Sequence, residues 1–135
     1  MLKTHQRLGL ITVAPLVATL IASNGAKGKN GDATGREIHA ALGSVTVAMY
    51  LTTASFSIFA PKIHGTPTRG PIRVHKILAL IHGPGMILTP ILGEMAYNQR
   101  SNGEKVHGIA SAHGAVAGVT AAAYGAAILS VMIKW

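Results

Sequence analysis

The chain has 135 residues, of which 49% are hydrophobic and only 12% are charged, and it contains no cysteine. A soluble domain usually carries about 25% charged residues, and a chain without cysteine can form no disulfide, thiolate metal site, iron–sulfur cluster or covalently attached c-type haem. The net charge of +8 comes from basic residues at the ends of apolar segments, where they suit lipid headgroups in a bilayer and not nucleic acid.

Four apolar segments follow one another along the chain, and each approaches or exceeds the roughly 20 residues that a bilayer-spanning helix needs. We expect these spans at about residues 8–23, 38–60, 73–97 and 106–133. The stretches between them are short, polar and rich in glycine or proline. Short connections predict an all-α, integral membrane, up-down-up-down four-helix bundle. Residues 1–135 would then form a single transmembrane domain.

Local signals suggest where the helices begin and bend. Thr34 and Ser101 each open a capping-box pattern that ends in glutamate three residues later, which predicts that a helix starts at each. Pro84 is expected to kink the third span, because its ring removes a backbone hydrogen bond. In the fourth span, Gly114 and Gly118 share one face, which allows close approach of another helix or of a flat ligand.

The basic residues indicate an orientation. In an up-down-up-down bundle, seven of them fall on the side of the termini and five on the other, and the positive-inside rule then places both termini in the cytoplasm. The seven are Lys3, Arg7, Lys62, Arg69, Arg73, Lys76 and Lys134, and the five are Lys27, Lys29, Arg36, Arg100 and Lys105.

One histidine stands at the start of each apolar segment. These are His5, His39, His75 and His107, separated by 34, 36 and 32 residues. Because successive helices alternate in direction, His5 and His75 share one end of the bundle, and His39 and His107 share the other. Helices one and three, or two and four, can be diagonal neighbours. The sequence therefore offers two bis-histidine pairs, which is the arrangement that two b-type haems stacked across a bilayer would need.

Two deeper histidines leave the ligand assignment open. His82 follows His75 by seven residues, about 10 Å further along the same helix face, and His113 follows His107 by six, about 9 Å further in. Either could replace the entrance histidine of its segment. An ionisable residue inside a span is a functional candidate by default, whereas a single histidine at a span entrance is more often an interfacial residue. His64, in the loop after the second span, is expected to be exposed to solvent.

Basic residues adjoin the candidate ligands at both ends. Haem propionates could be held there by charge-assisted hydrogen bonds. The same residues could equally flank lipid headgroups. They are Arg7 and Arg73 at the end of the termini, and Arg36 and Lys105 at the other.

One histidine per helix at about 34-residue spacing, paired first with third and second with fourth, resembles the cytochrome b561 superfamily. The similarity covers roughly residues 3–133 and is closest to small bacterial members that consist of little more than the four-helix core. The resemblance implies transmembrane electron transfer through one or two non-covalent b haems, with iron bound by His5 and His75 and by His39 and His107. For such a redox protein we expect other membrane subunits as partners, a quinone or a soluble carrier as redox partner, and a bacterial inner or other energy-transducing membrane as the location.

A second hypothesis is a non-redox structural or pigment-binding subunit of a membrane assembly. Chlorophyll needs a single axial imidazole and Gly/Ala-rich surroundings for a flat ring, and the fourth span would suit it. Under the redox hypothesis the protein is an electron carrier or an oxidoreductase subunit, since no independent catalytic site is evident. Glu94, near the end of the third span, could accept a proton from a quinol or simply face the headgroups.

Overall fold

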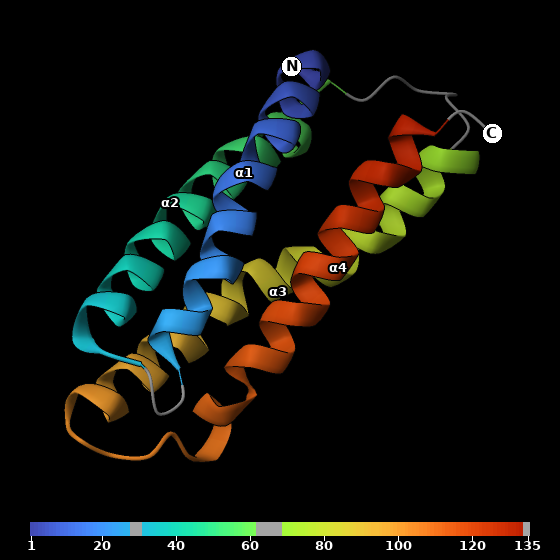
Figure 1. The fold of residues 1–135 in the computed structure, drawn as a ribbon. Coiled ribbons are helices and arrows are strands. Elements are labelled where there is room, and N and C mark those ends of the chain that lie inside the picture. The colour runs from blue at the N-terminus through green and yellow to red at the C-terminus, as the bar shows by residue number, and fades with distance from the viewer. Residues whose placement is uncertain (28–30, 62–68, 134–135) are drawn as a thin grey trace.

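The structure, a computed structural model, describes residues 1–27, 31–61 and 69–133. The predictions for Lys29, Lys62, His64 and Lys134 lie outside these residues. Four α-helices make up the described chain: α1 (Leu2–Ala26), α2 (Ala33–Ile58), α3 (Gly70–Ser101) and α4 (His113–Met132), with a short 3-10 helix, η1 (Gly108–Ala112), before α4. Within these ranges there is no strand. The predicted all-α four-helix bundle is confirmed, and α1 begins at the end of the bundle where α4 finishes (Figure 1).

The first three helices begin earlier than their apolar segments do. They start at Leu2, Ala33 and Gly70, because polar residues such as lysine, arginine and glutamine extend a helix readily beyond its apolar part. The entrance histidines of these helices therefore lie within the first two turns and not at the helix ends. α3 continues through Pro84 and Pro90, both of which lie inside the helix.

The predicted helix starts at Thr34 and Ser101 are wrong. The cap of α2 is Asp32, whose carboxylate accepts a hydrogen bond from the Gly35 amide at 2.6 Å. Ser101 is the last residue of α3. The Asp32 carboxylate thus takes the capping role that the sequence assigned to Thr34.

The fourth span is interrupted near its start. Gly108 has a φ of 60°, a left-handed conformation that glycine adopts without strain. The Gln99 side chain accepts a hydrogen bond from the His107 amide at 3.0 Å and reaches the His107 carbonyl at 3.5 Å. The two hydrogen bonds with Gln99 and the left-handed turn at Gly108 separate His107 from the helix, so that regular α-helix begins only at His113.

All four helical spans are long and apolar enough to cross a membrane. Their outward side chains are large and apolar, and Leu80, at 77% exposure, is an extreme example. Several buried positions are instead small or polar, among them Thr12, Thr46 and Thr120. An apolar exterior around a partly polar interior suits lipid and not water. The chain is thus an integral membrane protein.

The bundle consists of two helical hairpins. α1 packs against α2 along its length, and α3 against α4, whereas contacts between these pairs are sparse (Figure 1). We call α1–α2 the first hairpin and α3–α4 the second. They meet in a central cluster of Tyr50, Met86 and Tyr124, against which Leu16 and other partly buried apolar residues pack.

Gly85 marks the tightest approach of α3 to α4. A Cβ atom built at this position would collide with the hydroxyl of Thr120 on α4. We expect Gly85→Ala to force the helices apart and to lower the free energy of unfolding by about 1–3 kcal/mol, as overpacking typically does. The measurement is thermal unfolding followed by helical circular dichroism in detergent micelles.

Gly125→Ala, in α4, is the matched control, because a Cβ at Gly125 meets no atom within 4 Å. Alanine's better helix propensity should leave this variant unchanged or more stable by up to about 1 kcal/mol. Equal midpoints for the two variants would show that the close α3–α4 approach is absent from the protein in solution.

Candidate functional site

Four histidines face one another in two pairs. His5 of α1 lies against His75 of α3, with ring centroids 6.1 Å apart and planes at 87°. His39 of α2 lies against His113 of α4, with centroids 5.9 Å apart and planes at 82°. Each pair takes one ring from each hairpin. The two pairs occupy opposite ends of the bundle, because hairpin partners run in opposite directions.

Each of the four rings is anchored to the other helix of its own hairpin. In every case Nδ1 lies 2.9–3.0 Å from a backbone carbonyl oxygen. A carbonyl can only accept, so Nδ1 carries the proton and the Nε2 lone pair is left available. This is the tautomer of a histidine that ligates metal through Nε2, with the N–H bond fixing the ring's orientation. The bonds run from His5 to Thr53, His39 to Thr19, His75 to Ala127 and His113 to Thr89.

The ring spacing suits a single metal atom between two imidazoles. A metal–imidazole bond is about 2 Å long and the ring radius is roughly 1.1 Å, so rings on opposite sides of one metal have centroids about 6 Å apart. The observed separations are 6.1 and 5.9 Å. Among the described residues no cluster of three or more His, Cys, Asp or Glu side chains could hold a bare ion. A haem iron differs, because it needs only two axial ligands from the protein.

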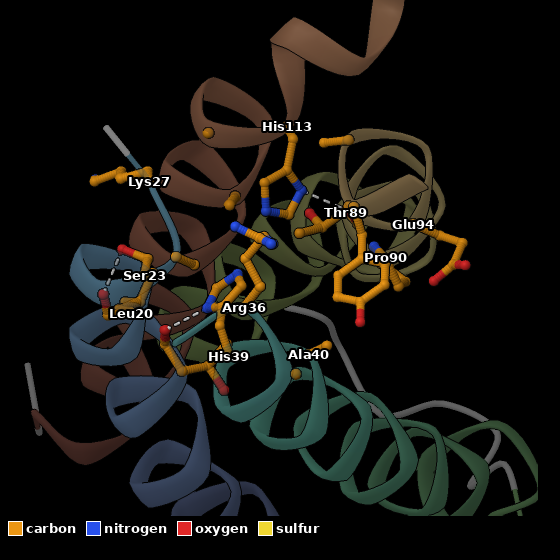
Figure 2. Close-up of a pocket in the computed structure, with 18 of the residues that line it drawn as sticks. Leu20, Ser23, Lys27, Arg36, His39, Ala40, Thr89, Pro90, Glu94 and His113 are labelled. Carbon is orange, nitrogen blue, oxygen red and sulfur yellow. Dashed lines mark hydrogen bonds between the residues drawn. The ribbon is translucent and has the colours of Figure 1, made fainter. Parts of the chain in front are cut away.

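A cavity of about 600 Å³ surrounds the His39–His113 pair (Figure 2). Its size is in the range of cofactor sites, roughly 300–1,000 Å³. All four helices contribute to its wall, with Gly114 and Gly118 on the α4 side. A Cβ at either glycine would meet no atom within 4 Å. In this fold the small-residue face of α4 therefore borders open space, as a flat ligand would require, and not a neighbouring helix.

One wall of the cavity also fixes the ring of His113. A Cβ at Gly93 of α3 would come within 3.0 Å of the His113 Cε1 atom, so glycine leaves the room that the imidazole occupies. Thr89, one turn earlier on α3, supplies the carbonyl that accepts the proton of His113 Nδ1. α3 thereby sets both the position and the orientation of this ring.

The rest of the cavity lining is mostly basic where it is charged. Among the described residues, Lys27, Arg36 and Arg100 line it, together with one acid, Glu94. Figure 2 shows the Arg36 side chain in the same space as the rings of His39 and His113, whereas Glu94 projects from the far side of α3. Glu94 accepts a hydrogen bond from Asn98 at 3.2 Å. An anionic group on a ligand beside the two rings would meet Arg36.

The remaining candidate residues lie elsewhere. His107 is exposed and caps η1, and the structure brings His113, not His107, to His39. His82 belongs to neither pair. It is 5% exposed, its Nδ1 lies 3.1 Å from the Tyr50 hydroxyl, and its ring contacts Tyr124. The other basic candidates, which are exposed at the ends of the bundle, are Arg7, Arg73 and Lys105.

A seven-residue pattern in the sequence singles out the four paired histidines. In each helix the histidine is followed at seven and fourteen residues by inward-facing positions, a spacing of two helical turns that keeps one face. His107 lacks this pattern and His113 has it. The repeat therefore identifies His113 as the partner of His39, whereas position at the start of the segment pointed to His107. The four sets are His5, Thr12 and Thr19; His39, Thr46 and Thr53; His75, His82 and Thr89; and His113, Thr120 and Ala127.

Comparison of the chain with known proteins found no similar protein. No protein-family model matches the chain, and no match is found to a curated protein or to a solved structure. The function must therefore be argued from the chemistry of the two histidine pairs.

The anchored rings predict a defined tautomer in the protein without added cofactor. We expect His5, His39, His75 and His113 to carry the proton on Nδ1, whereas exposed His107 should show the Nε2-protonated form that free imidazole side chains prefer. Long-range ¹H–¹⁵N correlation spectra of the detergent-solubilised chain distinguish the two forms, and single His→Gln variants assign the signals. An Nε2 proton on any of the four would contradict the hydrogen bonds to the carbonyls.

Proposed function

We propose that this protein transfers electrons across a membrane through two b-type haems, one held by His5 and His75 and the other by His39 and His113. The observation that carries the proposal is the pair geometry: two imidazoles face each other at about 6 Å, each with Nδ1 anchored and Nε2 free to ligate. The resemblance of the sequence to the cytochrome b561 superfamily points the same way.

The chain's part in this function is to orient ligands and exclude water. A bound haem supplies an iron that takes up and releases one electron. The carbonyl partners of Nδ1 hold each ring in place and raise its basicity as a ligand. Both imidazoles of a pair would serve as ligands of the group, and a site whose ligands all come from the protein would suit electron transfer and not catalysis at the iron.

The two sites lie far enough apart to span much of a bilayer. His39 is bonded to Thr19, which follows His5 by fourteen residues on α1, about 21 Å along the helix. Tyr50, His82 and Tyr124 occupy the interior between the pairs. An electron would thus pass from one end of the bundle to the other through a packed aromatic centre shielded by apolar side chains.

The partners follow from the two ends of the bundle. The charge of Arg36 in the cavity suits a haem propionate, while exposed Arg7, Arg73 and Lys105 suit lipid headgroups. A quinone or a soluble carrier would exchange electrons at one end, and another subunit of a membrane redox complex at the other. The excess of basic residues on the side of the termini supports a cytoplasmic position for the His5–His75 pair. The membrane we propose is a bacterial inner or other energy-transducing membrane.

A pigment-binding role is the weaker candidate. The open space beside Gly114 and Gly118 would also accept the ring of a chlorophyll. Chlorophyll takes a single axial imidazole, however, and here every candidate ligand faces a second imidazole. The pairing therefore favours a metal with two axial ligands.

Haem content tests the proposed ligands. We expect the purified chain to give a b-type reduced-minus-oxidised spectrum and two haems per chain in a pyridine haemochrome assay. His39→Ala and His113→Ala should each remove one haem. Both variants should lose the same haem, because the two substitutions each delete one ligand of the His39–His113 pair. His107→Ala is the matched control and should retain both.

Other outcomes would redirect the proposal. A chain without haem would exclude electron transfer through this cofactor, and a bound chlorophyll would favour the pigment-binding role. Loss of a haem on His107→Ala, with full retention on His113→Ala, would mean that the fourth ligand had been assigned to the wrong histidine.

Electron transfer across a bilayer tests the function itself. In proteoliposomes with ferricyanide inside and a membrane-impermeant reductant outside, the haem-loaded chain should reduce the internal ferricyanide. His39→Ala should lower the rate to that of vesicles without protein, because one end of the path is missing. A rate unchanged by this substitution would show that electrons do not use the proposed pair of sites.

A further inference from the structure

Each hairpin holds its own histidines without help from the other. In the first hairpin, His5 and His39 are both bonded across the α1–α2 interface, and the hydroxyls of Thr19 and Thr46 lie 3.0 Å apart across the same interface. In the second, His75 and His113 are bonded across the α3–α4 interface. Each hairpin therefore presents two oriented imidazoles, and it contributes one imidazole to each of the two sites.

The contact between hairpins is concentrated at the centre of the bundle. There the Tyr50 hydroxyl meets His82 Nδ1 at 3.1 Å, and the Tyr124 hydroxyl donates to the Gly9 carbonyl at 2.9 Å. Towards either end the hairpins face each other through a histidine pair. At the His39–His113 end, the cavity of about 600 Å³ extends between them. A void of this size contributes no packing, because the atoms that line it lack partners.

We propose that the cofactor itself docks the two hairpins, so that ring binding and hairpin closure are one equilibrium and the two sites bind cooperatively. The inference rests on the proposed function. A tetrapyrrole between His39 and His113 is ligated by both hairpins and fills the space that separates them. Once it has closed the hairpins, His5 and His75 are already positioned for a second ring, which then binds without the ordering cost.

Distances between spin labels test the closure directly. The chain has no cysteine, so cysteines introduced for labelling are unique. Ile21 on α1 (67% exposed) and Ile91 on α3 (53%) lie near the His39–His113 end on different hairpins. Ile21 and Ile38 on α2 (51%) form the matched control pair within the first hairpin. Pulsed electron paramagnetic resonance on the full chain in nanodiscs gives both distance distributions.

We expect the Ile21–Ile91 distribution to be broad in the haem-free chain and to narrow when haem is added, while the Ile21–Ile38 distribution stays narrow throughout. Ferric haem is itself paramagnetic, and zinc protoporphyrin takes only one axial ligand, so the loaded sample is measured with diamagnetic low-spin ferrous haem. The labels are gadolinium(III) chelates, because the reductant that keeps haem ferrous would destroy nitroxides. Equally narrow distributions with and without haem would overturn docking by the cofactor. A control pair that also broadens would mean that each hairpin needs the cofactor to form, which contradicts the self-contained hairpins.

A haem titration tests the coupling between sites. His5→Ala leaves only the His39–His113 site, and we expect its affinity to fall about 5- to 150-fold below that in the parent chain, the usual range for coupled sites. His107→Ala should bind as the parent does. In native mass spectra of the parent at one haem per chain, the singly loaded species should fall well below the roughly one half expected for independent sites.

The two possible failures are distinguishable. Absence of a haem Soret band overturns the proposed function and the docking proposal together. Two haems that bind with equal, independent affinity to a chain whose hairpins are already closed overturn the docking proposal alone.

Discussion

The structure depends on one repeated interaction, the hydrogen bond from a histidine Nδ1 to a backbone carbonyl of the neighbouring helix. A helical carbonyl has a second lone pair that the helix itself does not use. In an apolar interior, where water does not compete, this bond is stronger than it would be in solution. It joins the first turns of one helix to the second half of its partner, and so it sets the register of each hairpin and the direction of each imidazole at once.

That register explains the threonines of the interior. In the first hairpin, the threonines seven and fourteen residues after each histidine meet across the α1–α2 interface, as Thr12 meets Thr53 at 3.4 Å. The hydroxyls of these four threonines also donate to carbonyls of the preceding helical turn, so each has a partner within its own helix. In the second hairpin, His82 stands in one of these places and Ala127 in another. The Tyr50 hydroxyl forms a hydrogen bond with His82 Nδ1, and this bond links the two hairpins.

The sequence predicted the four spans and their order, because a continuous apolar segment of this length forms few stable structures other than a membrane-spanning helix. It also predicted that His5 and His75 would share one end of the bundle, which follows from chain direction alone. The helix starts were missed because polar residues extend helices past their apolar parts. His113 was left as an alternative to His107 because the break at Gly108, which moves the start of α4, leaves no trace in hydrophobicity. The contact of Tyr50 with His82 was not foreseen, since spans that are apolar nearly all round do not reveal which faces meet. Haem binding and the orientation in the membrane stay predictions.

The seven-residue spacing has a consequence for how such a chain can change. On each helix, the histidine and the carbonyl that this helix supplies to its partner's histidine lie fourteen residues apart. The separation of the two sites is therefore set by whole pairs of helical turns. Insertion of one residue between them would rotate everything beyond it by about 100° and turn a ring or its carbonyl towards lipid. The distance between the two sites is therefore not continuously adjustable. It can lengthen or shorten only in steps of about 10 Å, made in all four helices together.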